Sequence, residues 1–334
     1  NRVSEFFNSW DDLSANPQGT AERQTVVSTA ELLTSGFRRV DSQLTALKDN
    51  ADKDVASIVE EVNQIVSQIA NLNRFIKDAL VQGQTPNDLM DQRGVLLKSL
   101  GEKIGYTSVT DSFGQVNVYV GNGRPLVDGE TAGSLAAQVG SGSVYDVKIF
   151  LPGQNVLVSV PDTITGDIAS GELAAAIRFR DGYINTVRDR VDQLAYAINT
   201  QVNAQHSQGY GLDGTTLEDF FTPLDSLPSF DPLNPGKNAA RDFRVAATIT
   251  SDLRLLAAAR VEGTEIPPAL PGDNRNSVLM AGLRNISIAG DISVAGLGGA
   301  TIPDFIAGMV GQIGSETKGA DLDLRHQKVV VNYL

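Results

Sequence analysis

The 334-residue chain contains no cysteine. It therefore has no disulfide, no zinc-thiolate site and no cysteine nucleophile. Without cysteine, the sequence does not indicate whether the protein works in an oxidising or a reducing compartment. Aromatic side chains are scarce, at 6% of the residues against 41% for all hydrophobic side chains. Few aromatic rings are typical of aliphatic helix seams, so the composition favours a rod over a sphere. The length suggests two folding units, at about 150 residues for each.

Positive charge and long apolar runs are also limited. With 27 Lys and Arg against 40 Asp and Glu, the net charge is −13 and the isoelectric point is near 4.6. Binding to nucleic acid relies on clustered cations, so we predict no nucleic-acid partner. No apolar stretch approaches the roughly 20 residues of a membrane helix, so we predict no membrane insertion.

Both ends of the sequence suggest a piece of a longer protein. The start, NRVSEFFNSW, has no methionine and lacks the basic and apolar regions of a signal peptide. The end, VVVNYL, lies inside a plausible helical pattern. We therefore expect a trimmed fragment whose targeting segments could lie outside this sequence.

Motifs of catalysis and cofactor binding are also missing. The chain has no HExxH, GxSxG or GxxxxGK pattern. GYGLDG, at residues 209–214, fits GxGxxG in its letters, but it follows a predicted helix and not a strand, so it lacks the setting that cradles a phosphate. Its two histidines, His206 and His326, each fall near the end of a predicted helix, where a surface or capping role is expected because a cation complements the helix dipole. We predict no catalytic residue, no cofactor and no metal.

Two acidic groups resemble ion sites only weakly. Asp49, Asp52 and Asp54 look like the start of a calcium loop but lack its turn glycine and closing glutamate. A solvated helix face is the better interpretation of these three. The loop GYGLDGTTLEDFF, with Asp213, Glu218 and Asp219, is a slightly better ion candidate, although ligand binding there is also not favoured.

The strongest positive signal is a long helical repeat between residues 20 and 82. Its apolar side chains recur at steps of four and three, as two heptad stretches joined by a stutter near residues 47–55. The mean step of about 3.57 residues per turn predicts a nearly straight supercoil. A break at the polar DNADKD stretch, residues 48–53, is the main alternative. The predicted seam comprises Val26, Ala30, Leu33, Phe37, Val40, Leu44, Leu47, Ala51, Val55, Ile58, Val62, Ile65, Ile69, Leu72, Ile76 and Leu80.

Further helices and a strand-rich part complete the pattern. Apolar spacing predicts helices over 182–206 and 303–331, which can pack against the long seam. QVNVYVGNGRPLVDG predicts a hairpin turning at Gly121-Asn122-Gly123, and SVYDVKIFLPGQNVLVSV predicts a second strand pair turning at Pro152-Gly153. The stretches FTPLDSLPSFDPLNPGK and PPALPGDN are proline-rich connectors, and LRNISIAGDISVAGLGGATIP predicts short strands or coil.

The resulting fold class is α+β. We predict an elongated helical bundle or coiled-coil rod, built from both chain ends and the central helix, with an inserted β-rich domain. The predicted segments are a helical rod at 1–103, a β-rich segment at 104–165, the central rod helix at 166–210, a mixed outer domain at 211–302 and the C-terminal rod part at 303–334.

The stretch TPNDLMDQRGVLLKSL concentrates charge at the start of a predicted helix. Thr85 suits an N-cap, Pro86 the first helical position, and Asp88 the unpaired amides of the first turn. Asp91 and Arg93 do not face each other, because only residues three or four apart do so on a helix. A capped amphipathic helix is the favoured interpretation, ahead of a partner-facing charged patch and of catalysis.

The same stretch carries a family resemblance. PNDLMDQRGVLLKSL resembles the Asn-Asp-Leu-Leu-Asp-Gln-Arg helix of axial flagellar proteins, above all the FlgK family of hook-associated, or hook-filament junction, proteins. Four collinear segments agree: FFNSWDDLSANPQGTAERQTVV, QVNVYVGNGRPLVDG, the central helix ending in NAQHSQGYGLDGTTLEDFF, and FRVAATITSDLRLLAAARV followed by GDNRNSVLMAGLRN. Gly94 departs from the family pattern, which has an acidic residue after the arginine, and the short mixed segment suggests a reduced or absent outer domain.

The resemblance implies a structural adaptor subunit that joins hook to filament, located on the extracellular flagellum and exported without a cleaved signal peptide. Implied partners are copies of itself in a ring, the hook protein, the second hook-associated protein, and an export chaperone bound through a C-terminal segment beyond this sequence. The family offers no catalytic residues to carry over. Asp88, Asp91 and Arg93 are the candidates for salt links within the rod or to the next subunit.

Three alternatives stay open. Flagellin and the second junction protein share the helical rod, although GYGLDGTTLEDFF favours the first junction family. A wall hydrolase would need paired carboxylates in a pocket. A surface adhesin would use the β-rich part to bind its target.

Overall fold

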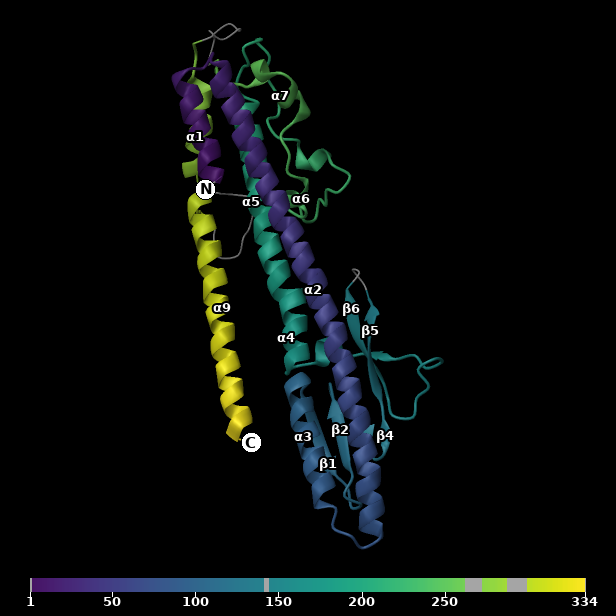
Figure 1. The fold of residues 1–334 in the computed structure, drawn as a ribbon. Coiled ribbons are helices and arrows are strands. Elements are labelled where there is room, and N and C mark those ends of the chain that lie inside the picture. The colour runs from purple at the N-terminus through teal and green to yellow at the C-terminus, as the bar shows by residue number, and fades with distance from the viewer. Residues whose placement is uncertain (1, 141–143, 262–271, 287–298, 334) are drawn as a thin grey trace. The chain divides into compact units, whose positions relative to one another are not determined.

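The computed structural model describes residues 2–140, 144–261, 272–286 and 299–333 (Figure 1). The chain folds into two compact units. Unit 1 comprises residues 1–44 and 186–334, and unit 2 comprises residues 45–185. The helices are α1 (Arg2–Ala15), α2 (Thr20–Val81), α3 (Asn87–Lys103), α4 (Glu172–Arg178), α5 (Ile184–His206), α6 (Ala239–Asp242), α7 (Ala247–Ser251), α8 (Arg275–Gly282) and α9 (Ile302–Tyr333).

The long helix α2 follows the predicted seam and continues through residues 48–53, so the alternative of a break there is wrong. No proline interrupts it, and its amphipathic side is buried along most of its length. The predicted seam positions Val40 and Leu47 are exceptions, because both side chains are exposed. Ile65 is only partly buried and its neighbour Val66 lies fully in the core, so the seam is displaced by one residue there.

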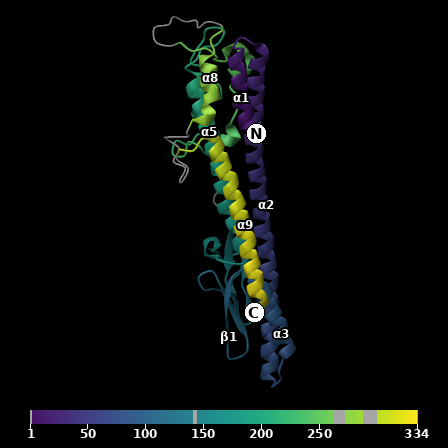
Figure 2. The same ribbon diagram turned by 90° about the vertical axis from the view of Figure 1, so that its left-hand side faces the viewer.

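Unit 1 is built around aromatic side chains that the sequence places far apart. Phe6 and Trp10 of α1 contact Phe220, which itself packs edge-on against Phe221. Aliphatic side chains of α2, α5 and the start of α9 complete this core. Both views show α8 at the same end of the unit as α1 (Figures 1 and 2), where Arg284, just after α8, donates to Asn8 of α1.

Unit 2 packs the second half of α2 and α3 against two small antiparallel sheets (Figure 1). The first sheet has the order β1-β2-β3-β4, and the second has the order β5-β6-β7. Side chains from one face of each sheet join α2, α3 and α4 in a single core. The strands are β1 (Tyr106–Thr110), β2 (Val116–Val120), β3 (Arg124–Asp128), β4 (Thr131–Ala132), β5 (Ser134–Val139), β6 (Tyr145–Phe150) and β7 (Asp162–Thr163).

The first predicted hairpin is confirmed. Strands β2 and β3 pair antiparallel, with Val120 opposite Arg124. The turn residues Gly121, Asn122 and Gly123 all have positive φ, at 38°, 51° and 82°. Glycine and asparagine reach this left-handed region at low cost, which is why the turn forms at these residues.

The second predicted strand pair is wrong, because β6 has a different partner from the one predicted. Strand β6 does form, but it pairs with β5 along its whole length, from Ser134 opposite Phe150 to Val139 opposite Tyr145. After β6 the chain makes a loop, and only Asp162 and Thr163 return to pair with Ile149 and Lys148. The apolar run at 156–160 lies in this loop and belongs to neither β6 nor β7.

The predicted later helices are confirmed as α5 and α9, with α5 preceded by a π-helical turn, Phe179–Tyr183, and by α4. The predicted connector FTPLDSLPSFDPLNPGK lies in the long stretch between α5 and α6, which has a 3-10 turn at Leu224–Ser226. Further 3-10 turns lie at Thr165–Asp167, Leu253–Leu255 and Leu283–Asn285. Most of the other predicted connector, PPALPGDN, lies outside the described residues. The stretch 287–298 and the side chain of His326 lie outside the described residues. The fold is α+β, as predicted, whereas the five predicted segments stay a prediction. Within the described part of the chain, no helix is long and apolar enough to cross a membrane.

Candidate subunit-contact and linking sites

Helix α3 begins differently from the prediction. Its first residue is Asn87, and the cap position belongs to Pro86, with φ −82° and ψ 58° and no side-chain capping bond. The carbonyl of Thr85 accepts from the amide of Asn87 at 2.9 Å. The predicted Thr85 cap is wrong because this residue lies one position too early for its hydroxyl to reach the second or third helical amide.

Arg93 lies inside unit 2, with 7% of its surface exposed. Its Nη1 donates to the side-chain oxygen of Asn73 on α2 at 2.8 Å and to the carbonyl of Gly114 at 2.7 Å. Burial lowers the pKa of Arg93, an effect that the nearby Asp111 carboxylate opposes. Arg93 therefore links α3 to α2 and to the turn that precedes β2.

Asn73 extends this link into the first sheet. Its amide nitrogen donates to the carbonyls of Val116 at 2.8 Å and Gly129 at 2.6 Å, and its oxygen accepts from the amide of Val116 at 3.0 Å. We call the five residues Arg93, Asn73, Gly114, Val116 and Gly129 the Arg93 clasp. Within the clasp, Arg93 Nη1 and both polar atoms of the Asn73 side chain are hydrogen-bonded, as buried polar groups require.

Asp88 and Asp91 point the other way. Both are exposed on α3, and within the described ranges neither forms an ion pair. A cleft of about 490 Å³ lies beside this face, lined by Gln68, Asn71, Leu72, Gln92, Val95 and Leu96 of α2 and α3. The three predicted contact residues are thus divided, with Arg93 turned inward and the two carboxylates outward.

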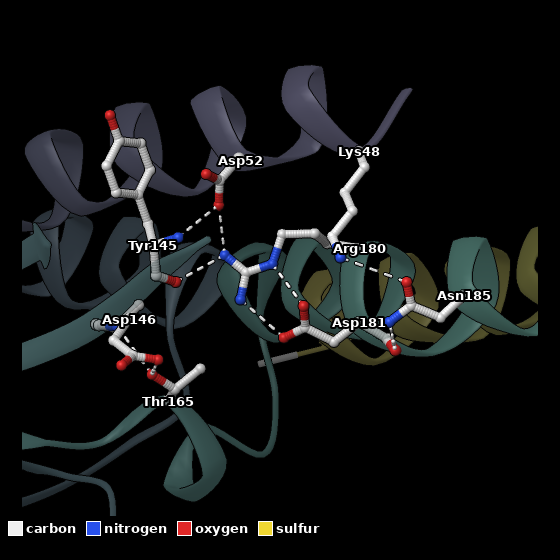
Figure 3. A network of polar contacts seen from close by, with 9 residues as sticks. Lys48, Asp52, Tyr145, Asp146, Thr165, Arg180, Asp181 and Asn185 are labelled. Atoms are coloured by element: carbon white, nitrogen blue, oxygen red, sulfur yellow. Dashed lines mark hydrogen bonds and ion pairs between the residues drawn. The ribbon is translucent and has the colours of Figure 1, made fainter. Parts of the chain in front are cut away.

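A second polar link surrounds Arg180, in the π-helical turn between α4 and α5 (Figure 3). Only 1% of the Arg180 side chain is exposed. Its Nη1 donates to Asp52 of α2 at 2.6 Å and to the carbonyl of Tyr145 at 2.7 Å, while Nε and Nη2 each reach Asp181 at 2.7 Å. Asp52 also accepts from the amide of Tyr145 at 2.9 Å. The link therefore ties α2, the start of β6 and the π-helical turn together.

Asp181 holds the pKa of Arg180 above its ordinary value, with burial opposing this and Asp52 adding to it. Nearby, Lys48 donates to Asn185 at 3.4 Å (Figure 3). The polar stretch of α2 is thus partly an interior feature. Of its three aspartates, Asp49 and Asp54 are exposed as predicted, whereas Asp52 serves as the counterion of a buried cation.

His206 is fully buried at the end of α5, so the predicted surface or capping role is wrong. Its Nδ1 lies 2.7 Å from the carbonyl of Glu218, and its Nε2 accepts from the amide of Ala257 at 3.0 Å. This pair of contacts requires a neutral imidazole that donates through Nδ1. Burial lowers its pKa to about 4, with the Glu218 contact opposing the shift and the Arg23 charge adding to it.

Asp192 and Asp219 are among the aspartates of unit 1 that have raised pKa values. Burial raises the pKa of Asp192 to about 6, although the amides of Ala240 and Asn238 donate to its carboxylate at 2.8 and 3.1 Å. Burial also raises the pKa of Asp219, and the charges of Asp225 and Glu218 add to this shift. Asp219 and Asp225 line a polar cleft of about 410 Å³.

The predicted ion candidates do not assemble into a metal site in the described structure. The Asp213 carboxylate accepts from the amide and hydroxyl of Thr215, at 3.0 and 2.7 Å, which makes it a turn-forming residue. Among the residues that the structure describes, no three His, Cys, Asp or Glu side chains gather in a way that could hold a metal ion.

The sequence is similar to proteins of the bacterial flagellum. A family profile described as the flagellar hook-associated protein FlgK helical domain matches residues 1–221. Flagellar hook-associated protein 1 of Salmonella typhimurium is 31% identical over 258 residues, which cover 76% of this chain and 45% of that protein. The Escherichia coli K12 protein of the same name is 28% identical over 259 residues, covering 77% and 46%. The chain spans about half the length of these two relatives.

The fold is similar to a solved structure as well. The structure of the flagellar hook junction protein FlgK from Burkholderia pseudomallei matches with a TM-score of 0.83, covering 99% of this chain and 92% of the other. The two sequences are 15% identical over this match, so the likeness is one of fold.

Proposed function

Because the chain belongs to the FlgK family of flagellar hook-associated proteins, we propose that it is a structural adaptor subunit joining hook to filament in a bacterial flagellum. The observation that carries this proposal is the match of the FlgK helical-domain profile to residues 1–221. It is supported by relatives named flagellar hook-associated protein 1 and by a fold shared with a hook junction protein. The expected location is the extracellular flagellum, reached without a cleaved signal peptide.

The proposed partners follow from this role. Copies of the chain would form a ring between the hook protein and the second hook-associated protein, and an export chaperone would bind a C-terminal segment beyond residue 334. We propose Asp88 and Asp91 as contacts to a neighbouring subunit, since both carboxylates are exposed beside the cleft of α2 and α3. Arg93 would act indirectly, by holding α3 through the Arg93 clasp.

The test is complementation of a strain that lacks its own junction protein. The full-length protein that contains this chain is expected to localise at the hook tip and to restore filament attachment. Failure to localise there would overturn the proposal. The double variant Asp88→Ala, Asp91→Ala should lower the number of attached filaments, whereas Asp49→Ala, Asp54→Ala removes two exposed charges of α2 and should leave it unchanged.

We propose no catalytic role. The polar cleft lined by Asp219 and Asp225 brings two carboxylates into one hollow, so it is a place at which the hydrolase alternative can be tested. The amides of Asn199 and Asn203 in the same cleft are already engaged with backbone carbonyls of Thr222 and Phe221. Purified protein is expected to release no more soluble fragments from peptidoglycan than the variant Asp219→Asn; a clear excess would revive the hydrolase alternative.

A further inference from the structure

The loop between β6 and β7 exposes a run of aliphatic side chains. We call Val156, Leu157, Val158 and Val160 the apolar knob; between 54% and 89% of each residue is exposed. None of the four belongs to the core of unit 2. Single exposed aliphatic residues are ordinary, but four within five positions form a contiguous apolar surface, which marks an interaction site.

The knob has a defined shape of its own. The side chain of Asn155 accepts from the amide of Leu157 at 3.0 Å, and its carbonyl accepts from the amides of Val158 and Ser159 at 3.1 and 2.9 Å. Before it, the amide of Gln154 donates to the carbonyl of Leu151 at 3.0 Å, and the Gln154 side chain accepts from the amide of Leu151 at 2.8 Å. These turns present the knob in one arrangement, which lowers the entropy cost of docking.

Unit 1 carries an apolar groove of about 390 Å³. We call it the four-helix groove, because its walls come from α1, α2, α5 and α9; its apolar lining includes Leu33, Phe37, Val40, Leu194, Ile306 and Met309. Val40 was predicted as a seam residue, yet 37% of it is exposed here. The volume falls within the roughly 300–1,000 Å³ of sites that bury a ligand.

The charged residues that line the groove favour a docking surface that is uncharged or acidic. The chain as a whole carries a net charge of −13, but the charged residues that line the groove are Arg2 and Arg39. The loop LPGQNVLVSVP, which holds the knob, contains no charged residue. Asp162 follows it directly, is exposed and lies 3.4 Å from Arg124 Nε of the same chain. Docking would therefore bring an acidic residue toward the rim arginines without placing a charge in the apolar floor.

We propose that the apolar knob of one copy docks into the four-helix groove of a neighbouring copy. This inference rests on the proposed function, which requires contacts between copies. A patch and a hollow that complement each other on one chain form a heterologous contact, and such a contact builds a ring when the rotation between copies closes and an open helix when it does not. Burying the knob and the groove lining together removes both apolar surfaces from water, so each copy would be stabilised at two faces.

Disulfide cross-linking tests the contact directly, because the chain has no native cysteine. Leu157→Cys and Val40→Cys would be introduced singly into differently tagged copies of the full-length protein, and both would be co-produced in the strain lacking its junction protein. Oxidation of isolated hook-junction assemblies is expected to give a mixed-tag dimer in at least tenfold higher yield than the pair Leu157→Cys with Leu233→Cys. Leu233 is a matched control, since it is an equally exposed leucine in another loop.

Three results would overturn the proposal. A mixed-tag yield no higher than that of the control pair would contradict the contact. A dominant dimer between two copies of Leu157→Cys would show a knob-to-knob contact instead. If the double variant Val40→Cys, Leu157→Cys gave cross-linked monomers, the knob would be reaching the groove of its own chain.

A functional arm separates this contact from the proposed function. Leu157→Asp is expected to lower the number of attached filaments at least tenfold with an unchanged melting temperature, whereas Leu233→Asp should match the parent protein. Normal filament attachment by Leu157→Asp would overturn the docking contact alone. If the parent protein failed to localise at the hook tip, the proposed function would fall, and the cross-linking yield of purified, concentrated protein would still decide the contact.

Discussion

At the scale of single residues, His206 ties the stability of unit 1 to pH. Its pKa is lowered from 6.5 to about 4 by burial, so the unfolded chain takes up this proton more readily than the folded one. The resulting stabilisation is complete above pH 6.5 and is lost as the pH falls from 6.5 through 4. Its full size is on the order of 3 kcal/mol in the free energy of unfolding.

Asp192 has the opposite dependence. Its pKa is raised from 3.8 to about 6, so the unfolding free energy falls as the pH rises from 3.8 through 6. Between pH 4 and 6, the contributions of the two residues to the pH dependence of the unfolding free energy should largely cancel in the parent protein. In Asp192→Asn, we expect the unfolding free energy to rise steeply with pH over this range, because the His206 contribution is then unopposed.

The measurement is urea denaturation at several pH values, followed by the fluorescence of Trp10, the single tryptophan and part of the unit 1 core. Asp49→Asn is the matched control, since its carboxylate is exposed, and it should keep the parent profile. An Asp192→Asn profile as flat as that of the parent would contradict the assigned role of His206.

Arg93 should be worth far more to stability than its exposed neighbours. Arg93→Ala leaves the Asn73 oxygen and the Gly114 carbonyl without their charged donor in a buried place. We expect the free energy of unfolding to fall by about 3 kcal/mol, against less than about 0.5 kcal/mol for Asp91→Ala on the same helix. Urea denaturation followed by circular dichroism measures both, and equal effects would argue against the Arg93 clasp.

The contacts of these residues could not be predicted from the sequence, because they join positions that are far apart along the chain. Arg93 was recognised as important, but its partner Asn73 lies on another helix and Gly114 on a loop, and no local spacing connects them. His206 looked like a surface cation because its two hydrogen-bond partners are 12 and 51 positions away. The Thr85 cap failed on a local detail, the backbone angles of Pro86, which composition does not encode.

At the scale of elements, the stutter in α2 coincides with the link to Arg180. Asp52→Ala should remove the acceptor for Arg180 Nη1 and for the amide of Tyr145. Arg180 stays buried and keeps the Asp181 carboxylate and the Tyr145 carbonyl as partners, but it loses one of its two counterions, so we expect a loss of about 2–4 kcal/mol in unfolding free energy. Asp54→Ala, two positions along the same helix and exposed, should change it by less than about 0.5 kcal/mol.

Hydrogen exchange locates this effect. In Asp52→Ala, the amide of Tyr145 and those of residues 179–185 should exchange faster than in the parent protein, because their anchor to α2 is lost. Amides in the first sheet serve as an internal reference and should keep their protection. Uniform loss of protection across unit 2 would instead mean that Asp52 stabilises the unit as a whole without a local role.

Periodicity predicted the helices well, since a seam that repeats every three or four residues is a property of the sequence itself. It also found β2, β3 and β6. The run at 156–160 has the β-branched composition of a strand, but composition does not determine which segment pairs with β6. In the structure β6 pairs with β5 on one edge and with Asp162 and Thr163 on the other.

At the scale of the whole molecule, both the family and the fold class were within reach of the sequence. Five collinear segments pointed to the FlgK family, and the family profile over residues 1–221 agrees. The length also suggested two folding units, but their boundaries, which fall inside α2 and α5, were not within reach of the sequence. Periodicity along α2 and α5 gives no sign that each helix passes from one unit to the other.

That discontinuity has a consequence for the order of folding. Unit 2 is one uninterrupted stretch, residues 45–185, whereas residues 1–44 cannot complete unit 1 until the chain beyond residue 186 has appeared. When a chain emerges N-terminus first, from a ribosome or from a secretion pore, unit 2 can therefore fold before unit 1 is complete. Trp10 would stay exposed to solvent while the sheets of unit 2 form. Its burial would then report the completion of unit 1.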